Sequence, residues 1–97
     1  MRIEWHPDAF EDLGRIGTTD QKRIRDILGE LEKLDDARQR LVPYTGKLKG
    51  YWKLRVGDYR LVCRIERQEG QYVVVIHLAH RSVIYHPRSI RTIKRRS

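Results

Sequence analysis

The chain lacks the features that mark secreted and membrane proteins. Its 97 residues include one cysteine, three prolines and a single phenylalanine. A lone cysteine, Cys63, excludes an internal disulfide and fits a reducing compartment. No apolar run approaches the roughly 20 residues of a membrane-spanning helix, and the N-terminus has no apolar stretch typical of a signal peptide. We therefore expect a cytoplasmic protein that does not insert into a membrane.

Motifs for metals and nucleotide phosphates are also missing. The sequence has no cysteine–histidine cluster at zinc spacing and no paired acidic motif for magnesium. It contains neither a glycine-rich phosphate loop nor a nucleophile-elbow motif. We therefore expect no metal and no other cofactor.

Acidic residues are scarce in one part of the chain only. Residues 1–36 hold 6 Lys/Arg against 10 Asp/Glu, whereas residues 37–97 hold 15 against 3, which gives the net charge of +8. A net charge of +12 in the second segment attracts anions such as nucleic acid, an acidic protein or an anionic membrane surface. High charge can also serve solubility alone, but its uneven distribution favours binding. From about Lys47 onward we expect a polyanion-binding surface.

The order of elements predicts a single α+β domain over residues 1–97. Residues 2–5 alternate as in a strand, and Pro7 can open a helix that ends near Gly17. A second helix can start at Thr18, whose spacing to Gln21 matches a capping box. Two helices with so short a join are expected to form an antiparallel helical hairpin.

Three further strands are predicted over residues 52–56, 59–65 and 72–79, after a loop at residues 41–50. Gly57-Asp58 is a two-residue hairpin signal, and residues 68–71 form the second turn. We expect one twisted antiparallel sheet, with the helical hairpin on one face. Residues 87–97, with five Lys/Arg, are either a frayed helix or disordered.

Side chains of a strand alternate between the two sheet faces, which separates apolar from basic positions. The set expected under the helices is Trp52, Leu54, Val56, Tyr59, Leu61, Cys63, Ile65, Tyr72, Val74, Ile76 and Leu78. The cations and imidazole expected on the open face are Lys53, Arg55, Arg60, Arg64 and His77. Such a face can bind phosphates, since each arginine fork pairs with two phosphate oxygens. RNA cleavage by its own 2′-OH needs only a base, an acid and a cation, without metal.

Two segments resemble motifs of the RelE/ParE superfamily of type II toxins. Residues 50–62 read GYWKLRVGDYRLV, similar to that family's lysine, x, arginine-or-lysine and G-x-Y-R strand pair. Residues 80–85 read HRSVIY, similar to its G-x-R and V-Y ending, with His80 where a glycine is common. The resemblance spans roughly the whole chain before residue 87 and implies a RelE-like fold.

The resemblance implies one of two toxic activities. The RelE branch is a ribosome-dependent, metal-independent mRNA endoribonuclease that inhibits translation, whereas the ParE branch inhibits DNA gyrase without cutting RNA. A non-catalytic nucleic-acid-binding relative is a further alternative. We favour the RelE branch because all five of its basic and tyrosine positions are filled. Implied partners are the ribosome, mRNA and a cognate acidic antitoxin.

Roles for individual residues follow from the same resemblance. Lys53 and Arg55 would grip phosphates, Arg60 would stabilise the pentacoordinate phosphate, and Arg81 would orient the phosphate or help the leaving group. Tyr85 would stack on a base or act as the general base. The neighbouring His86 could supply acid or base instead. The further positions expected to contact RNA are Lys47, Lys49, Arg64, His77 and His86.

Overall fold

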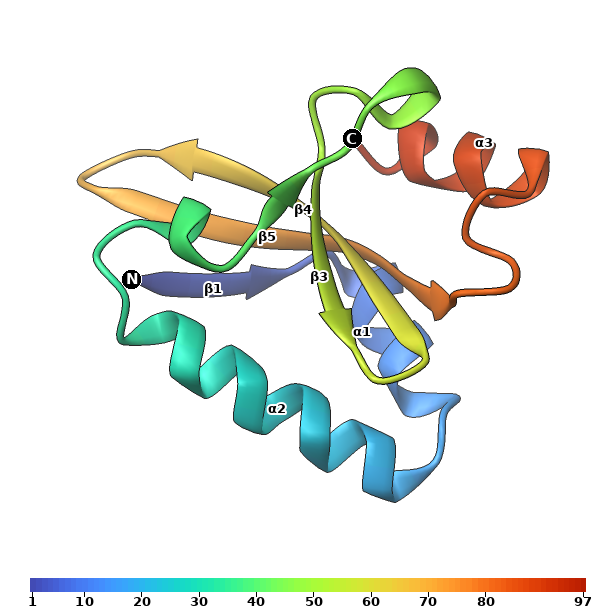
Figure 1. Ribbon diagram of the computed structural model, residues 1–97, viewed down its shortest axis with the longest axis horizontal. Helices are drawn as coiled ribbons and strands as arrows, with labels where there is room; N and C mark the ends of the chain where they lie inside the picture. The colour runs from blue at the N-terminus through green and yellow to red at the C-terminus, as the bar shows by residue number, and fades with distance from the viewer.

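A five-stranded mixed sheet forms the centre of the molecule, and the computed structural model describes all 97 residues (Figure 1). Its strands are β1 (Arg2–Trp5), β2 (Val42–Pro43), β3 (Trp52–Val56), β4 (Tyr59–Arg67) and β5 (Gln71–His80). They lie in the order β1-β5-β4-β3-β2, with β1 parallel to β5 and the other pairs antiparallel. The predicted α+β class is confirmed. The sheet differs from the prediction in two ways: β2 is an additional fifth strand, and β1 pairs parallel rather than antiparallel. The helices between β1 and the later strands make this parallel pairing possible.

Two helices follow β1, as the sequence predicts. α1 (Pro7–Gly14) begins at Pro7, where His6 Nδ1 accepts a hydrogen bond from the Asp8 N–H at 3.1 Å. α2 (Thr18–Glu32) has Gly17, not Thr18, as its N-cap, so the expected capping box does not form. The Gln21 side chain instead donates to the Ile16 carbonyl at 2.9 Å. None of the helices is long and apolar enough to cross a membrane.

The face beneath α1 and α2 holds the larger core. α1 packs on β5, and α2 packs on β1 and β3. The predicted inward sides of β3 and β4 are confirmed, because their buried residues here include Leu54, Val56, Leu61 and Cys63. These side chains meet Ile24 and the other apolar residues of the helices, so alternation in the sequence was a sufficient guide to this face.

The predicted side of β5 is wrong for its first half. Val73 and Val75 enter the core beneath the helices, whereas Ile76 is buried on the opposite face and Val74 packs beside it. Tyr72 also lies outside this core, with the Arg2 guanidinium 4.2 Å from its ring centroid. The cause is a β-bulge, since Cys63 pairs with Val75 but Val62 pairs with His77. One extra residue on β5 reverses the side on which the following residues point.

The sequence predicted that the opposite face would be open, but this face is covered. A second core of six buried residues lies there, and α3 (Pro87–Arg95) covers it: Tyr44, Leu48, Val62, Ile76, Ile84 and Ile93. Thus the C-terminal segment forms a docked helix whose Ile93 side chain is 0% exposed. Its outward side carries the exposed cations Arg88, Arg91, Lys94 and Arg95. Helix α3 therefore covers this part of the sheet, and its own exposed cations form the basic surface there.

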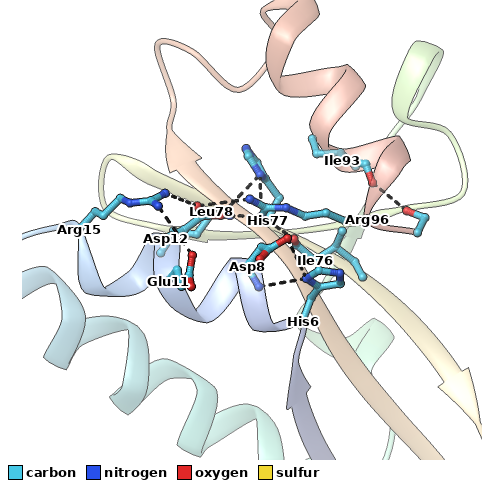
Figure 2. A network of polar contacts seen from close by, with 11 residues as sticks. His6, Asp8, Glu11, Asp12, Arg15, Ile76, His77, Leu78, Ile93 and Arg96 are labelled. Carbon is cyan, nitrogen blue, oxygen red and sulfur yellow. Dashed lines mark hydrogen bonds and ion pairs between the residues drawn. The ribbon is translucent and has the colours of Figure 1, made fainter.

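Three polar residues fasten α3 to α1 at the β5 side of the sheet (Figure 2). Arg96 Nη1 donates to Asp12 Oδ2 at 2.7 Å and to the Ile76 carbonyl at 3.0 Å, and it lies 3.2 Å from His77 Nδ1. We call Asp12, His77 and Arg96 the clasp. His77 is only 8% exposed, so its predicted place on an open face is wrong: its side chain lies between Asp12 and Arg96.

Candidate active site

Tyr44 lies at the centre of a group of predicted site residues. Its N–H donates to the Tyr51 carbonyl at 3.0 Å, which extends the β2–β3 pairing by one step. The ring is 5% exposed and forms part of the second core. Lys53 Nζ lies 5.5 Å from its centroid, within cation–π range, and the Tyr85 ring meets it edge-on at 6.2 Å. Tyr44 thereby connects Lys53 on β3 with Tyr85 on the segment before α3.

Arginines gather at the tight turn between β3 and β4. Arg60 Nη1 donates to the carbonyls of Gly57 and Tyr59, both at 2.9 Å. Gly57 has a φ of 57°, which suits glycine at this turn. Arg55 lies directly opposite Arg60 in the strand register, a like-charge pair that a bound anion would relieve.

Arg81 approaches the same turn from the end of β5. Its N–H donates to the Asp58 carbonyl at 2.8 Å, and its Nε lies 3.6 Å from Asp58 Oδ1. Both side chains are well exposed, which makes this ion pair weak and easily exchanged for another anion. The turn thus holds Arg60 and Arg81 through the carbonyls of three consecutive residues, 57–59.

Burial governs the protonation of the two groups beneath this site. It raises the pKa of Tyr44, with Tyr85 and Cys63 adding to the effect and Arg60 opposing it. The Tyr44 hydroxyl therefore stays protonated at neutral pH and can only donate or accept as a neutral group. Burial also raises the pKa of the Cys63 thiol to about 12, which agrees with packing in the core rather than a reactive thiolate.

Other predicted residues lie outside this group. Arg64 Nε donates to Glu66 Oε1 at 2.8 Å, so its charge is already balanced. Lys47 and Lys49 are exposed on either side of the buried Leu48, on the connection that runs beside α3 (Figure 1). His86 is exposed at the N-cap of α3, next to Tyr85 in the chain.

Two residues of the site region escaped sequence reasoning. Tyr44 was part of the loop expected at residues 41–50, although a large aromatic residue within a loop was an available signal. Arg40 lines a shallow pocket of about 260 Å³ with Val42, Lys53, Leu54 and Arg55, and nothing in its local sequence distinguished it. An apolar hollow of about 230 Å³ between β1 and the first two helices shares no residue with this region. No group of three or more His, Cys, Asp or Glu side chains gathers as a metal site would require.

The chain matches a known protein family over most of its length. The family model for the ParE toxin of the type II toxin–antitoxin system parDE matches residues 3–85. No curated protein sequence matches the chain.

Several solved structures share the fold. The RelBE2 toxin–antitoxin complex of Mycobacterium tuberculosis aligns with a TM-score of 0.70 at 24% identity, covering 84% of this chain and 91% of that one. A mutant of the Escherichia coli toxin RelE in the free state gives 0.67 at 17% identity, covering 98% and 95%. The YoeB/ParE toxin of Agrobacterium tumefaciens gives 0.61 at 21% identity, covering 82% and 98%. The predicted RelE-like fold is thereby confirmed.

Proposed function

The chain belongs to the ParE toxin family of type II toxin–antitoxin systems, and we propose that it is the toxin of such a system and cleaves mRNA on the ribosome. The observation that carries the proposal is the grouping around Tyr44 and the β3–β4 turn. These residues come from three segments: Lys53 from β3, Arg60 from β4, and Arg81 and Tyr85 from the connection between β5 and α3. Lys53 and Tyr85 lie against Tyr44, and Arg60 and Arg81 are held at the β3–β4 turn. This set supplies positive charges that can bind a phosphate, together with a phenol beside them.

The proposed reaction uses the RNA itself as nucleophile. The 2′-oxygen bonds to the adjacent phosphorus while its proton goes to a base, and the bond from phosphorus to the 5′-oxygen breaks as that oxygen gains a proton. The products are a 2′,3′-cyclic phosphate and a 5′-hydroxyl end. Lys53 and Arg60 would stabilise the negative charge that builds up on the phosphorane, which is the largest expected contribution. Tyr85 or His86 would serve as the base.

Arg81 and Arg55 would complete the phosphate grip. Arg81 is held only by the exposed Asp58, so a substrate phosphate can replace that carboxylate without disturbing buried structure. Arg55 faces Arg60 across the hairpin and would bind the neighbouring phosphate. Lys47, Lys49 and the cations of α3 would bind more distant parts of the RNA or ribosome, with an affinity that falls steeply as salt rises.

A cognate antitoxin is the partner that the proposal requires. Related solved structures include the RelBE2 complex of M. tuberculosis and a RelB–RelE complex of Methanococcus jannaschii. Residues 37–97 carry a net charge of +12, which an acidic antitoxin segment would complement. We expect that segment to be disordered when free and to fold on binding.

The test is a cell-free translation reaction with the mRNA 5′ ends mapped by primer extension. The wild type should cut within codons, and Arg60→Ala and Tyr85→Phe should each lower the cleavage rate by about 100-fold or more. Arg64→Ala is the matched control, because it removes an arginine of β4 that is already paired with Glu66. Wild-type protein that stops translation in this reaction and leaves the mRNA intact would rule out the ribonuclease.

Gyrase inhibition is the second candidate function, and the ParE name of the matching family favours it. In that case the basic surface would meet protein rather than RNA. A supercoiling assay with purified gyrase distinguishes the two functions. Inhibition by wild type and by Tyr85→Phe alike, without any mRNA cleavage, would establish the ParE activity in its place.

A further inference from the structure

The Tyr44 hydroxyl is a buried polar group without a hydrogen-bond partner. Only one other buried side-chain atom shares this property, His77 Nε2 in the clasp. Tyr44 is 5% exposed, so water does not satisfy its hydroxyl from the surface. An unpaired buried hydroxyl lowers stability, whereas phenylalanine would fill the same space without that cost. The position therefore calls for a partner that is absent from the free protein.

The surroundings of this hydroxyl identify the kind of partner. The Lys53 ammonium lies 5.5 Å from the Tyr44 ring centroid, and the positive charge of Arg60 opposes the rise that burial gives the tyrosine's pKa. Two cations therefore act on a tyrosine that stays neutral and keeps its O–H donor. This combination fits a phosphate oxygen, since a hydrogen bond to an ionised acceptor is stronger than one between neutral groups.

The Tyr85 ring lies against Tyr44. This ring meets Tyr44 edge-on at 6.2 Å, yet Tyr85 is 58% exposed and no hydrogen bond holds its hydroxyl. An exposed aromatic ring that turns outward can stack on an RNA base, a contact that tolerates any base. The same movement would uncover the Tyr44 hydroxyl.

We propose that Tyr44 is a phosphate-binding residue of this site: with Tyr85 turned outward onto a base, its hydroxyl donates a hydrogen bond to a non-bridging oxygen of the phosphate held by Lys53 and Arg60. This inference rests on the proposed ribonuclease function and adds a residue that the family motif does not contain. It also assigns a use to the unpaired donor, which packing alone leaves unexplained.

The test compares Tyr44→Phe with wild type in two measurements. The probe is a short single-stranded RNA with one 2′-deoxynucleotide at its centre, which cannot be cut there, titrated at low salt and followed by NMR. Tyr44→Phe should bind this probe about 10- to 100-fold more weakly, because it lacks one hydrogen bond to a charged group. In thermal unfolding the same variant should equal or exceed the wild type, because it no longer buries an unpaired hydroxyl.

A matched tyrosine supplies the control. Tyr51 borders the same core, but its hydroxyl already bonds the Ser97 hydroxyl. Tyr51→Phe should therefore leave the affinity for the probe unchanged. Equal weakening by both variants would show a general effect on packing and overturn the proposal.

The outcomes separate this inference from the ribonuclease itself. Wild-type affinity in Tyr44→Phe overturns the Tyr44 proposal whether or not mRNA is cut. A marked loss of thermal stability in Tyr44→Phe also overturns it, because the hydroxyl would then have a partner within the protein. If Tyr44→Phe loses affinity while wild type cuts no mRNA during translation, the phosphate site stands and the ribonuclease function falls.

Discussion

The two faces of the sheet are covered in different ways, and the candidate site depends on the less robust of the two. Beneath α1 and α2 lies a core of 14 buried residues drawn from long periodic segments. Beneath α3 lies a core of six, supplied by single residues of loops, strands and the last helix. A smaller core has fewer contacts to compensate for any loss. Since Tyr44 belongs to it, the geometry around Lys53 and Tyr85 relies on α3 being in place.

This difference also separates stability from function within one small domain. The helix-side core stabilises the fold, and its strand residues carry no site chemistry. The far side combines packing with the candidate site, because the Tyr44 ring belongs to the core and Lys53 and Tyr85 lie against it. Substitutions on this side should therefore alter both stability and activity, whereas those on the helix side should alter stability alone.

The largest effects are expected from a matched pair of isoleucines. Ile24 on α2 and Ile93 on α3 are both 0% exposed, one in each core. Substitution of either by alanine should lower the free energy of unfolding by about 3–4 kcal/mol, through lost burial and the remaining cavity. Urea unfolding gives this value, and only Ile93→Ala should also weaken RNA binding. An Ile93→Ala loss below about 1 kcal/mol would mean that α3 is not packed as closely as α2.

A somewhat smaller effect is expected from the clasp that connects α3 to α1. Asp12→Ala removes the carboxylate that Arg96 and the Leu78 N–H both use, at 2.7 and 3.4 Å. Asp12 and Arg96 are each 11% exposed, so the guanidinium left behind would be largely buried without a counter-charge. The free energy of unfolding should fall by about 3 kcal/mol, near the lower end for broken buried pairs.

Arg15 provides the control for the clasp. It also pairs with Asp12, at 3.4 Å, but its side chain is 71% exposed. Arg15→Ala should therefore change stability by less than about 0.5 kcal/mol. Similar losses from the two variants would show that the clasp contributes no more than a surface ion pair, and that hydrophobic contacts alone hold α3.

Sequence reasoning succeeded where apolar and polar residues alternate, and it failed where they do not. In β3 and β4, arginines and lysines separate the apolar residues, so the sides of Leu54 and Leu61 could be assigned. β5 is apolar on both faces, and the bulge near Ile76 shifts its register, so alternation could not identify its sides. The docking of α3 depends mainly on the apolar residues Ile90 and Ile93. In the sequence these two residues stand among five cations, so the apolar pattern was too weak to predict a packed helix.

The candidate site was predictable to a similar extent. The motif resemblance identified Lys53, Arg60, Arg81 and Tyr85, whose proposed roles remain predictions. It could not identify Tyr44, because the role of that residue depends on contacts with side chains far along the chain. The clasp was invisible for the same reason, since its members lie at positions 12, 77 and 96 and meet only in the folded protein.

The smallest effect concerns pH and again involves the clasp. Burial lowers the pKa of His77 from its ordinary 6.5, Arg96 lowers it further, and Asp12 opposes both. The folded protein then keeps His77 neutral at pH values where the unfolded chain binds a proton. Stability is therefore complete above about pH 7 and falls as the pH drops below 6.5, by at most about 1.4 kcal/mol for each pH unit.

Urea unfolding of wild type and His77→Gln between pH 7.5 and 5 measures this contribution, which should appear as a loss of stability toward pH 5. His77→Gln should show a shallower decline with falling pH, although it is less stable at pH 7.5. His86→Gln, which changes an exposed histidine, should keep the wild-type slope. A slope that His77→Gln leaves unaltered would assign the acid sensitivity to other groups. The connection between the two sheet faces would then not respond to protonation, and α3 would stay fastened over the candidate site at acid pH.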